Sequence, residues 1–186
     1  MKIKINIPNS LSILRILMIP ALMLLIINSS AKNYPLLIGL YFATIILDFF
    51  DGFLARILHQ ETELGKILDP LADKLLISAT IIALIIKSDF PLWLALIIFS
   101  RDLIILGASA LMFKGKHTIS PSILIGKVTF GVLGALLLVY IIDLYEHLDL
   151  TIIKRFFIVL SFSFLTWSVL EYYHIFMSYI REKNAK

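Results

Sequence analysis

The sequence predicts an all-α, polytopic membrane protein with six transmembrane helices around a polar cavity that faces the cytoplasm. Its 186 residues are 60% hydrophobic and 16% charged, whereas a soluble domain is about half apolar and about a quarter charged. The apolar residues fall into six runs, each with at least the roughly 20 residues that a membrane-spanning helix needs. Charged residues inside these runs gather toward one side of the predicted membrane, which indicates the cavity.

The six predicted helices form one membrane domain over residues 1–186, because no linker or repeat interrupts them. Further apolar runs follow the first, which lacks a small-residue cleavage site, so we interpret it as a helix rather than a signal peptide. Pro35, Pro91 and Pro121 lie near predicted helix starts, where a missing N–H costs little. The last run exceeds the membrane thickness, so we expect it to tilt or protrude. The predicted helices cover residues 11–30, 35–57, 67–87, 91–113, 121–142 and 152–180.

Short polar or turn-prone stretches separate consecutive predicted helices. The first helix ends at Ser29 to Asn33, and the second ends at the stretch from His59 to Gly65. Lys87 to Asp89 ends the third helix, and Lys114 to His117 ends the fourth. The acidic stretch from Asp143 to Asp149 separates the fifth helix from the sixth.

Lysine and arginine residues outside the predicted helices or near their ends lie mostly on one side of the membrane. Nine lie on that side and four on the other, so the positive-inside rule places both termini and the cavity in the cytoplasm. We therefore predict a multi-pass protein of the cytoplasmic (inner) membrane. The basic residues form no continuous stripe, so no nucleic-acid partner is predicted. The absence of cysteine excludes a disulfide framework and a thiolate metal site.

Besides the lysines and arginines counted for the topology, ten charged residues lie inside the predicted helices. Each costs several kcal/mol in hydrocarbon unless it is paired or hydrated. We therefore expect them to line a wet cavity or to bind ions. They are Arg15, Asp48, Asp51, Asp69, Asp73, Lys74, Arg101, Asp102, Lys127 and Glu171.

Four of these residues are aspartates at helical spacing. Asp48 and Asp51 are three residues apart, and Asp69 and Asp73 are four residues apart. Each pair therefore shares one helix face, with its members separated by roughly 4.5 and 6 Å along the axis. A short connection makes the two helices antiparallel neighbours, so we expect the four carboxylates to converge. Mg²⁺ or Mn²⁺ would neutralise them, and two ions about 4 Å apart would stabilise a diphosphate during displacement.

The aspartates allow two other interpretations. An intramembrane aspartate can cap a helix or form a salt bridge, although four in this pattern fit that role poorly. An aspartate-lined cavity also suits a divalent-cation transporter. Transport would require polar residues that continue to the outer side, whereas Leu36 to Leu47 and Leu75 to Ile86 are almost wholly apolar. A transporter is therefore the remote alternative.

The aspartates belong to a longer motif between Asp48 and Asp73. It reads Asp-x2-Asp-Gly-x2-Ala-Arg-x8-Gly-x3-Asp-x3-Asp, and it resembles the signature of the CDP-alcohol phosphotransferase (CDP-alcohol phosphatidyltransferase) family at every fixed position. Asn6 to Arg15 resembles the amino-terminal stretch of bacterial phosphatidylglycerophosphate synthases in this family. Leu68 to Lys74 is similar to the same group and to cardiolipin synthases of the eukaryotic type. The predicted six spans agree with the family.

The resemblance implies an enzyme of phospholipid biosynthesis. It implies transfer of a phosphatidyl group from CDP-diacylglycerol to an alcohol acceptor, with release of CMP. Asp48, Asp51 and Asp69 are then expected to hold the metal, with Asp73 at the edge of the metal site. Asp73 is also the expected general base, which takes a proton from the acceptor hydroxyl.

The remaining motif residues are expected to contact the nucleotide and the diphosphate. Gly52 and Gly65 lack side chains and allow close backbone approach, and Ala55 is small for the same reason. Arg56 would offset the charge of the departing CMP. Two plainer roles stay open: the glycines could pack helices together, and Arg56 could be an ordinary positive-inside anchor.

The acceptor is expected to bind through a second basic pair, Arg101 and Lys127, because the resemblance implies that these positions hold its phosphate. Asp102 lies about 100° around the helix from Arg101, so we expect it to be a poor direct partner. The expected acceptor is glycerol 3-phosphate, giving phosphatidylglycerophosphate. The alternative is phosphatidylglycerol, giving cardiolipin, because the Arg101-Asp102 stretch and Pro121 to Lys127 resemble cardiolipin synthases. The resemblance also suggests a homodimer.

Overall fold

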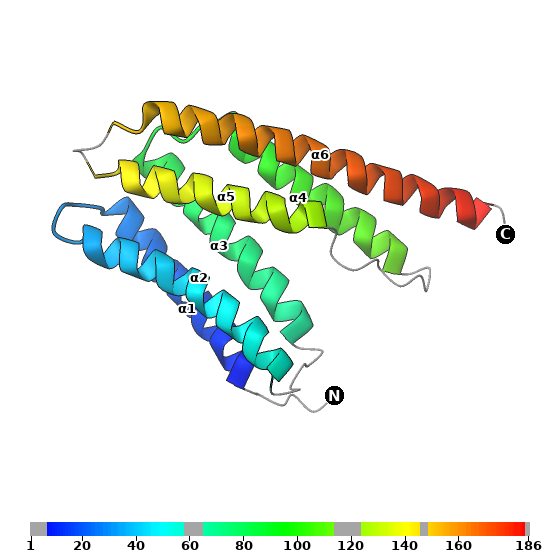
Figure 1. Ribbon diagram of the computed structural model, residues 1–186, viewed down its shortest axis with the longest axis horizontal. Coiled ribbons are helices and arrows are strands. Elements are labelled where there is room, and N and C mark those ends of the chain that lie inside the picture. Colours follow the sequence, from blue (N-terminus) through cyan, green and yellow to red (C-terminus); the bar gives the residue numbers. More distant parts are fainter. Residues whose placement is uncertain (1–6, 58–64, 114–123, 146–148, 185–186) are drawn as a thin grey trace. The chain divides into compact units, whose positions relative to one another are not determined.

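The computed structural model describes residues 7–57, 65–113, 124–145 and 149–184 (Figure 1). Within these ranges the chain forms six α-helices and no β-strand, which confirms the predicted all-α class. The first helix begins at Ile7 rather than at residue 11, and the predicted start of the fifth helix at Pro121 lies outside the described residues. The helices are α1 (Ile7–Ile27), α2 (Tyr34–Ile57), α3 (Gly65–Lys87), α4 (Leu92–Phe113), α5 (Leu124–Asp143) and α6 (Thr151–Asn184).

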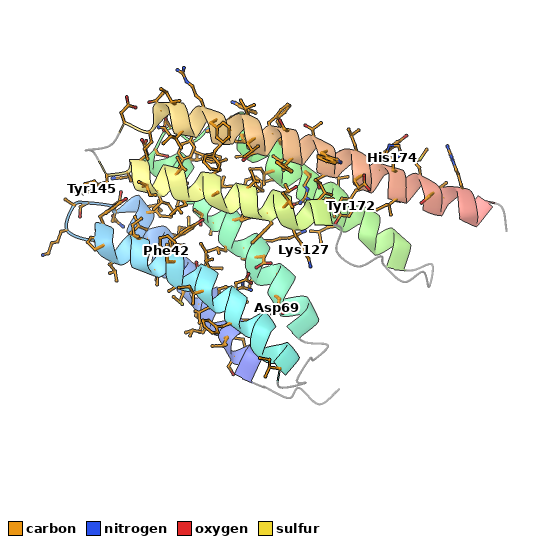
Figure 2. The ribbon with its side chains drawn as sticks, viewed as in Figure 1. Phe42, Asp69, Lys127, Tyr145, Tyr172 and His174 are labelled. Atoms are coloured by element: carbon orange, nitrogen blue, oxygen red, sulfur yellow. The ribbon has the colours of Figure 1, made fainter. Side chains whose placement is uncertain are left out.

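The outer faces of the helices carry large apolar side chains, including Phe42 on α2 (Figure 2). Leu17 on α1 is 68% exposed and Ile152 on α6 is 82% exposed, a pattern that suits lipid better than water. With 34 residues, α6 is about 50 Å long and exceeds the roughly 30 Å hydrocarbon core, as predicted. Among the described residues, the helices long and apolar enough to cross a membrane cover Asn9–Ile27, Ile125–Asp143 and Thr151–Ser178. For α2, α3 and α4 the crossing stays a prediction.

Asn33 shapes the connection between α1 and α2. Its Nδ2 donates to the Asn28 carbonyl at 2.9 Å, and its Oδ1 accepts the Ser30 N–H at 2.7 Å. Its own carbonyl accepts the Leu37 N–H at 3.0 Å and so starts the hydrogen-bond ladder of α2. The polar stretch expected to end the first helix therefore reverses the chain, as asparagine often does in turns.

Close contacts divide the chain into two compact units, and each is described by itself. The first unit comprises residues 1–90 and 140–149, and in it α1 packs against both α2 and α3. The second unit comprises residues 91–139 and 150–186, and in it α4 packs against α6. One membrane domain over the whole chain stays a prediction.

In the first unit, the buried face of α1 changes from polar to apolar along the helix. Its residues recur every three or four positions, as expected of a single helix stripe. The first three are polar or charged and the next three are aliphatic. They are Asn9, Ser12, Arg15, Ile19, Leu22 and Ile26.

The other two helices of the first unit show the same division. On α2, buried Tyr41 and Thr44 precede Asp48 at the same spacing of three or four residues. On α3, Asp69 and Asp73 precede a buried apolar stretch that ends at Leu84. Because the chain reverses between consecutive helices (Figure 1), the polar parts of all three helices lie at one end of this unit.

Candidate active site

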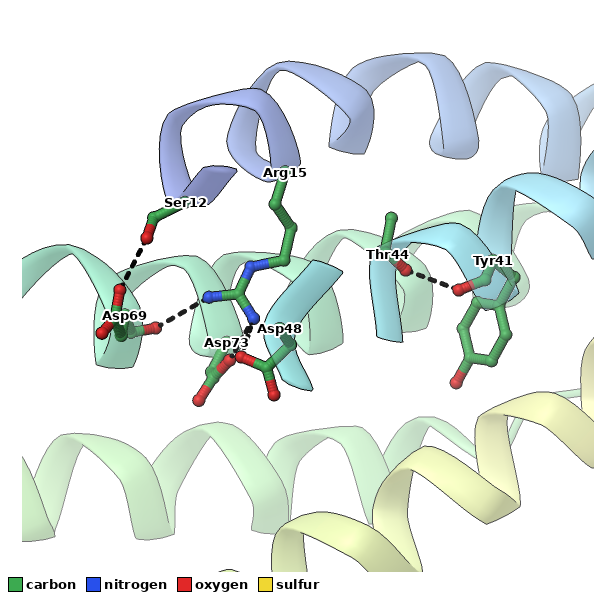
Figure 3. Close-up of polar contacts among 7 residues, drawn as sticks. All are labelled: Ser12, Arg15, Tyr41, Thr44, Asp48, Asp69 and Asp73. Atoms are coloured by element: carbon green, nitrogen blue, oxygen red, sulfur yellow. Dashed lines mark hydrogen bonds and ion pairs between the residues drawn. The ribbon is translucent and has the colours of Figure 1, made fainter. Parts of the chain in front are cut away.

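Arg15 is the centre of a polar cluster at that end of the first unit (Figure 3). Its side chain has 0% exposure. Its Nη1 donates to Oδ1 of Asp48 on α2 and, at 3.0 Å, to Oδ1 of Asp73 on α3. Its Nη2 lies 3.5 Å from the main-chain carbonyl oxygen of Asp69. The planar guanidinium, with several donors in a fixed fork, suits this contact with two helices.

Ser12 extends the cluster one turn toward the start of α1. Its Oγ donates to Oδ1 of Asp69 at 2.7 Å. Ser12 and Arg15 are three residues apart, so both side chains leave the same face of the helix. Two polar residues of α1 therefore contact three aspartates that come from two other helices (Figure 3).

The structure brings Asp48, Asp69 and Asp73 together, and α1 is the helix that joins them. Direct pairing of the two aspartate-bearing helices is the expected cause, but the most extensive packing of α2 and of α3 among the described residues is with α1. Over the same part of the chain, no three acidic or histidine side chains form a ready-made metal-binding group. Arg15 bonds to two of the carboxylates and Ser12 bonds to the third.

The composition and exposure of the cluster nevertheless fit a divalent cation. Aspartates outnumber Arg15 three to one in the contacts just described, and their oxygens are the ligands that Mg²⁺ and Mn²⁺ prefer. The side chains of Asp48 and Asp73 are 37% and 29% exposed. An ion or a phosphate can therefore reach them from outside while Arg15 stays buried behind them.

Most of the remaining motif residues lie on the last turns of α2. The helix continues through them to Ile57, but their side chains lie outside the described residues. Gly65 is the first residue of α3 and is partly buried, one turn before Asp69. The expected metal and nucleotide contacts of these residues stay predictions. The residues whose side chains are not described are Asp51, Gly52, Ala55 and Arg56.

Arg101 on α4 is the centre of a different cluster, in the second unit. Its Nη1 lies 2.7 Å from Oδ1 of Asp102, and its Nη2 donates to Oγ of buried Ser168 on α6 at 2.6 Å. Its guanidinium carbon lies 6.0 Å from the centre of the Tyr172 ring, within range of a cation–π contact. The prediction that Asp102 would be a poor partner is wrong. The two Cα–Cβ bonds diverge, but the long arginine side chain bends back to its neighbour.

Lys127 lies on α5 in the same unit, and its side chain is exposed. The adjacent Gly126 is close to α6, because a Cβ atom at Gly126 would stand 3.7 Å from Oη of Tyr172. Tyr172 therefore lies near both Arg101 and the turn of α5 that carries Lys127; Figure 2 labels Lys127 and Tyr172. Phosphate binding by Arg101 and Lys127 stays a prediction.

Sequence reasoning did not assign Ser12, Ser168 or Tyr172 to a site. A local pattern could have found Ser12, since it lies on the face of α1 that carries Arg15. No local pattern could have found Ser168, which is 67 residues from Arg101 in the sequence. Its contact depends on how α4 packs against α6.

Comparison with known proteins gives a consistent family match. The family model described as CDP-alcohol phosphatidyltransferase matches residues 5–173, which include both clusters. A Rickettsia bellii protein named "CDP-diacylglycerol--glycerol-3-phosphate 3-phosphatidyltransferase" is 38% identical over 130 residues, covering 70% of this chain and 72% of its own. An Aquifex aeolicus protein of the same name is 31% identical over 169 residues, covering 90% and 93%. A Mycobacterium tuberculosis protein named "Putative cardiolipin synthase" is 27% identical over 179 residues, covering 94% and 81%.

Proposed function

The chain belongs to the CDP-alcohol phosphatidyltransferase family, and on that premise we propose that this membrane enzyme makes phosphatidylglycerophosphate. It would transfer the phosphatidyl group of CDP-diacylglycerol to glycerol 3-phosphate and release CMP. The observation that carries the proposal is the gathering of the motif aspartates Asp48, Asp69 and Asp73 around buried Arg15. The names of the Rickettsia and Aquifex relatives support this acceptor.

The acidic cluster is proposed to hold Mg²⁺ or Mn²⁺, with two ions at full occupancy. When bound, these ions supply positive charge to the diphosphate of the nucleotide lipid. The carboxylates of Asp48, Asp69 and Asp73 offer the oxygen donors that hard cations need, and the motif predicts that Asp51 supplies a fourth. Access for the ions is supported by the partial exposure of Asp48 and Asp73.

Asp73 is proposed as the general base. It takes the proton of the acceptor hydroxyl, whose oxygen attacks the β-phosphorus of CDP-diacylglycerol. A phosphorus–oxygen bond forms to the acceptor as the bond between the β-phosphorus and the bridging oxygen breaks. The electron pair leaves with CMP, and the proton stays on Asp73. The 29% exposure of Asp73 suits contact with a hydroxyl that arrives from outside.

The other motif residues are proposed to position the nucleotide lipid. Gly52, Gly65 and Ala55 would let the backbone approach the nucleotide closely. Arg56 would contact the diphosphate and offset the charge of the departing CMP. These roles rest on the motif and on its position where α2 ends and α3 begins.

The acceptor phosphate is proposed to bind at Arg101 and Lys127. A second candidate acceptor is phosphatidylglycerol, which would make the enzyme a cardiolipin synthase. The Arg101–Asp102 ion pair favours phosphatidylglycerol as the acceptor. Asp102 already offsets part of the positive charge of Arg101, which a doubly charged phosphate would need. The name of the Mycobacterium tuberculosis relative also supports it.

The same proposal includes the placement and assembly of the enzyme. The distribution of lysine and arginine supports an active site and termini on the cytoplasmic side of the inner membrane. A homodimer is the proposed assembly. The transporter alternative is set aside, because members of this family are enzymes.

An acceptor-by-acceptor assay tests the proposal. Purified protein is incubated with radiolabelled CDP-diacylglycerol, Mg²⁺ and each acceptor in turn, and the labelled lipids are separated. We expect the label in phosphatidylglycerophosphate when glycerol 3-phosphate is present. Label only in cardiolipin, with phosphatidylglycerol as acceptor, would select the second candidate. A folded, metal-supplied protein that transfers label to no acceptor would contradict the proposed reaction.

A further inference from the structure

Arg15 and a metal ion would need the same carboxylate oxygens. One nitrogen of Arg15, Nη1, contacts Oδ1 of Asp48 and Oδ1 of Asp73, so a single NH₂ group joins carboxylates of two helices. A buried guanidinium is strongly unfavourable unless acids match its charge. The acids in turn would repel one another without a cation. Arg15 therefore supplies part of the positive charge that a bound metal ion would supply to these carboxylates.

We propose that Arg15 is a built-in counter-cation, which keeps the carboxylates assembled without metal and competes with the divalent ion for Asp48. This inference rests on the proposed metal site. The unit charge of Arg15 reduces the attraction of the cluster for a second cation. A metal bond to Oδ1 of Asp48 would also replace the hydrogen bond from Arg15. Both effects weaken metal binding in the absence of substrate.

The contacts of Arg15 explain how it can release one acid and remain buried. Its Nη2 reaches the main-chain carbonyl oxygen of Asp69, and its Nη1 also reaches Asp73, both on α3. The contact of Arg15 with Asp48, by contrast, is made to α2. If the metal takes Asp48, the guanidinium keeps two oxygen partners on α3 and its charge is not left unmatched. Asp48 is also the more exposed of the two ion-pair partners, at 37% against 29% for Asp73.

Metal affinity measured without any turnover tests this role. Full-length protein in lipid nanodiscs, free of CDP-diacylglycerol, is titrated with Mn²⁺, and free Mn²⁺ is followed by electron paramagnetic resonance. Arg15→Gln should lower the Kd for Mn²⁺ about tenfold, because it removes the competing charge. Arg15→Lys keeps the charge and should stay close to wild type. Arg155→Gln is the matched control, since it removes the same charge from an exposed position outside the first unit and should leave the Kd unchanged.

Thermal unfolding of the same samples gives a second readout. In EDTA, Arg15→Gln should unfold several degrees below wild type, because its carboxylates lose the positive charge of Arg15. Saturating Mn²⁺ should raise its Tm by more than it raises that of wild type. If Arg15→Gln can be purified only with Mn²⁺ and unfolds on chelation, that result also supports the proposal.

Three outcomes would overturn the inference. An Arg15→Gln protein that binds Mn²⁺ no more tightly than wild type would show that Arg15 does not compete with the metal ion. A Tm of Arg15→Gln in EDTA equal to that of wild type would show that Arg15 does not hold the carboxylates together. Both results leave the metal site itself intact. A wild-type protein that binds no Mn²⁺, with Asp48→Asn indistinguishable from it, would overturn the proposed metal site together with the role of Arg15.

Discussion

The two units of this enzyme each hold a key arginine, but they surround it differently. Arg15 contacts aspartates from two other helices, and the acids of its cluster outnumber it. Arg101 contacts a single aspartate, Asp102 on its own helix, and completes its surroundings with the hydroxyl of Ser168 and the ring of Tyr172. In the contacts described, three acids face one guanidinium at the first cluster, which supports the proposed cation site. One acid and two neutral partners surround Arg101, which supports the proposed phosphate site there.

Chelation should have the largest effect, because it acts on the acid-rich cluster alone. EDTA is expected to reduce CMP release from CDP-diacylglycerol to background, and excess Mg²⁺ or Mn²⁺ should restore it. Circular dichroism of the chelated protein would check that its helices persist. Full activity in chelator would show that the cluster around Arg15 holds no metal ion needed for the reaction.

Replacing the proposed base should be nearly as severe. Asp73→Asn is expected to lower kcat about a thousandfold, since an amide cannot take the acceptor proton. The amide oxygen can still accept a hydrogen bond from Arg15, so the protein should insert and fold. Asp89→Asn, at an exposed position between α3 and α4, is the matched control. Normal turnover by purified Asp73→Asn protein would exclude Asp73 as the base.

Removal of the second arginine should act on the acceptor rather than on the chemistry. Arg101→Ala is expected to raise the acceptor KM about ten- to a hundredfold, the range for losing a charge-assisted hydrogen bond. The KM for CDP-diacylglycerol should change much less. Arg155→Ala, exposed near the start of α6, controls for loss of a positive charge. An unchanged acceptor KM would show that the phosphate binds elsewhere.

The smallest expected effect concerns the orientation of Arg101. Ser168→Ala removes one hydrogen bond to its guanidinium and leaves the ion pair with Asp102. The acceptor KM should rise about threefold, in line with a single hydrogen bond. Ser163→Ala is the control on the same helix, because its exposed hydroxyl donates to the Val159 carbonyl at 2.9 Å. A larger rise in the KM for CDP-diacylglycerol than in that for the acceptor would contradict this role.

Hydropathy alone was enough to locate the helices. The third helix was predicted over residues 67–87 and covers Gly65–Lys87, and the fourth was predicted over 91–113 and covers Leu92–Phe113. The physical reason is that an apolar run in lipid must satisfy its backbone hydrogen bonds internally, and a helix does so. Spacing likewise placed Asp69 and Asp73 on one face, because helix periodicity is a local property.

The partners of the charged side chains were decided only by tertiary structure. Arg15 meets Asp48 and Asp73 across 33 and 58 residues of sequence, because α1 packs against both α2 and α3. Periodicity shows which face of a helix is polar, but it does not show which faces meet. The sequence did not predict even the ion pair between the neighbouring residues Arg101 and Asp102, because backbone direction does not fix where the end of an arginine side chain lies. The sequence by itself therefore determined the helices and the acids of the site. Packing determined that these acids contact Arg15, because ion pairing depends on distance in space rather than on distance along the chain.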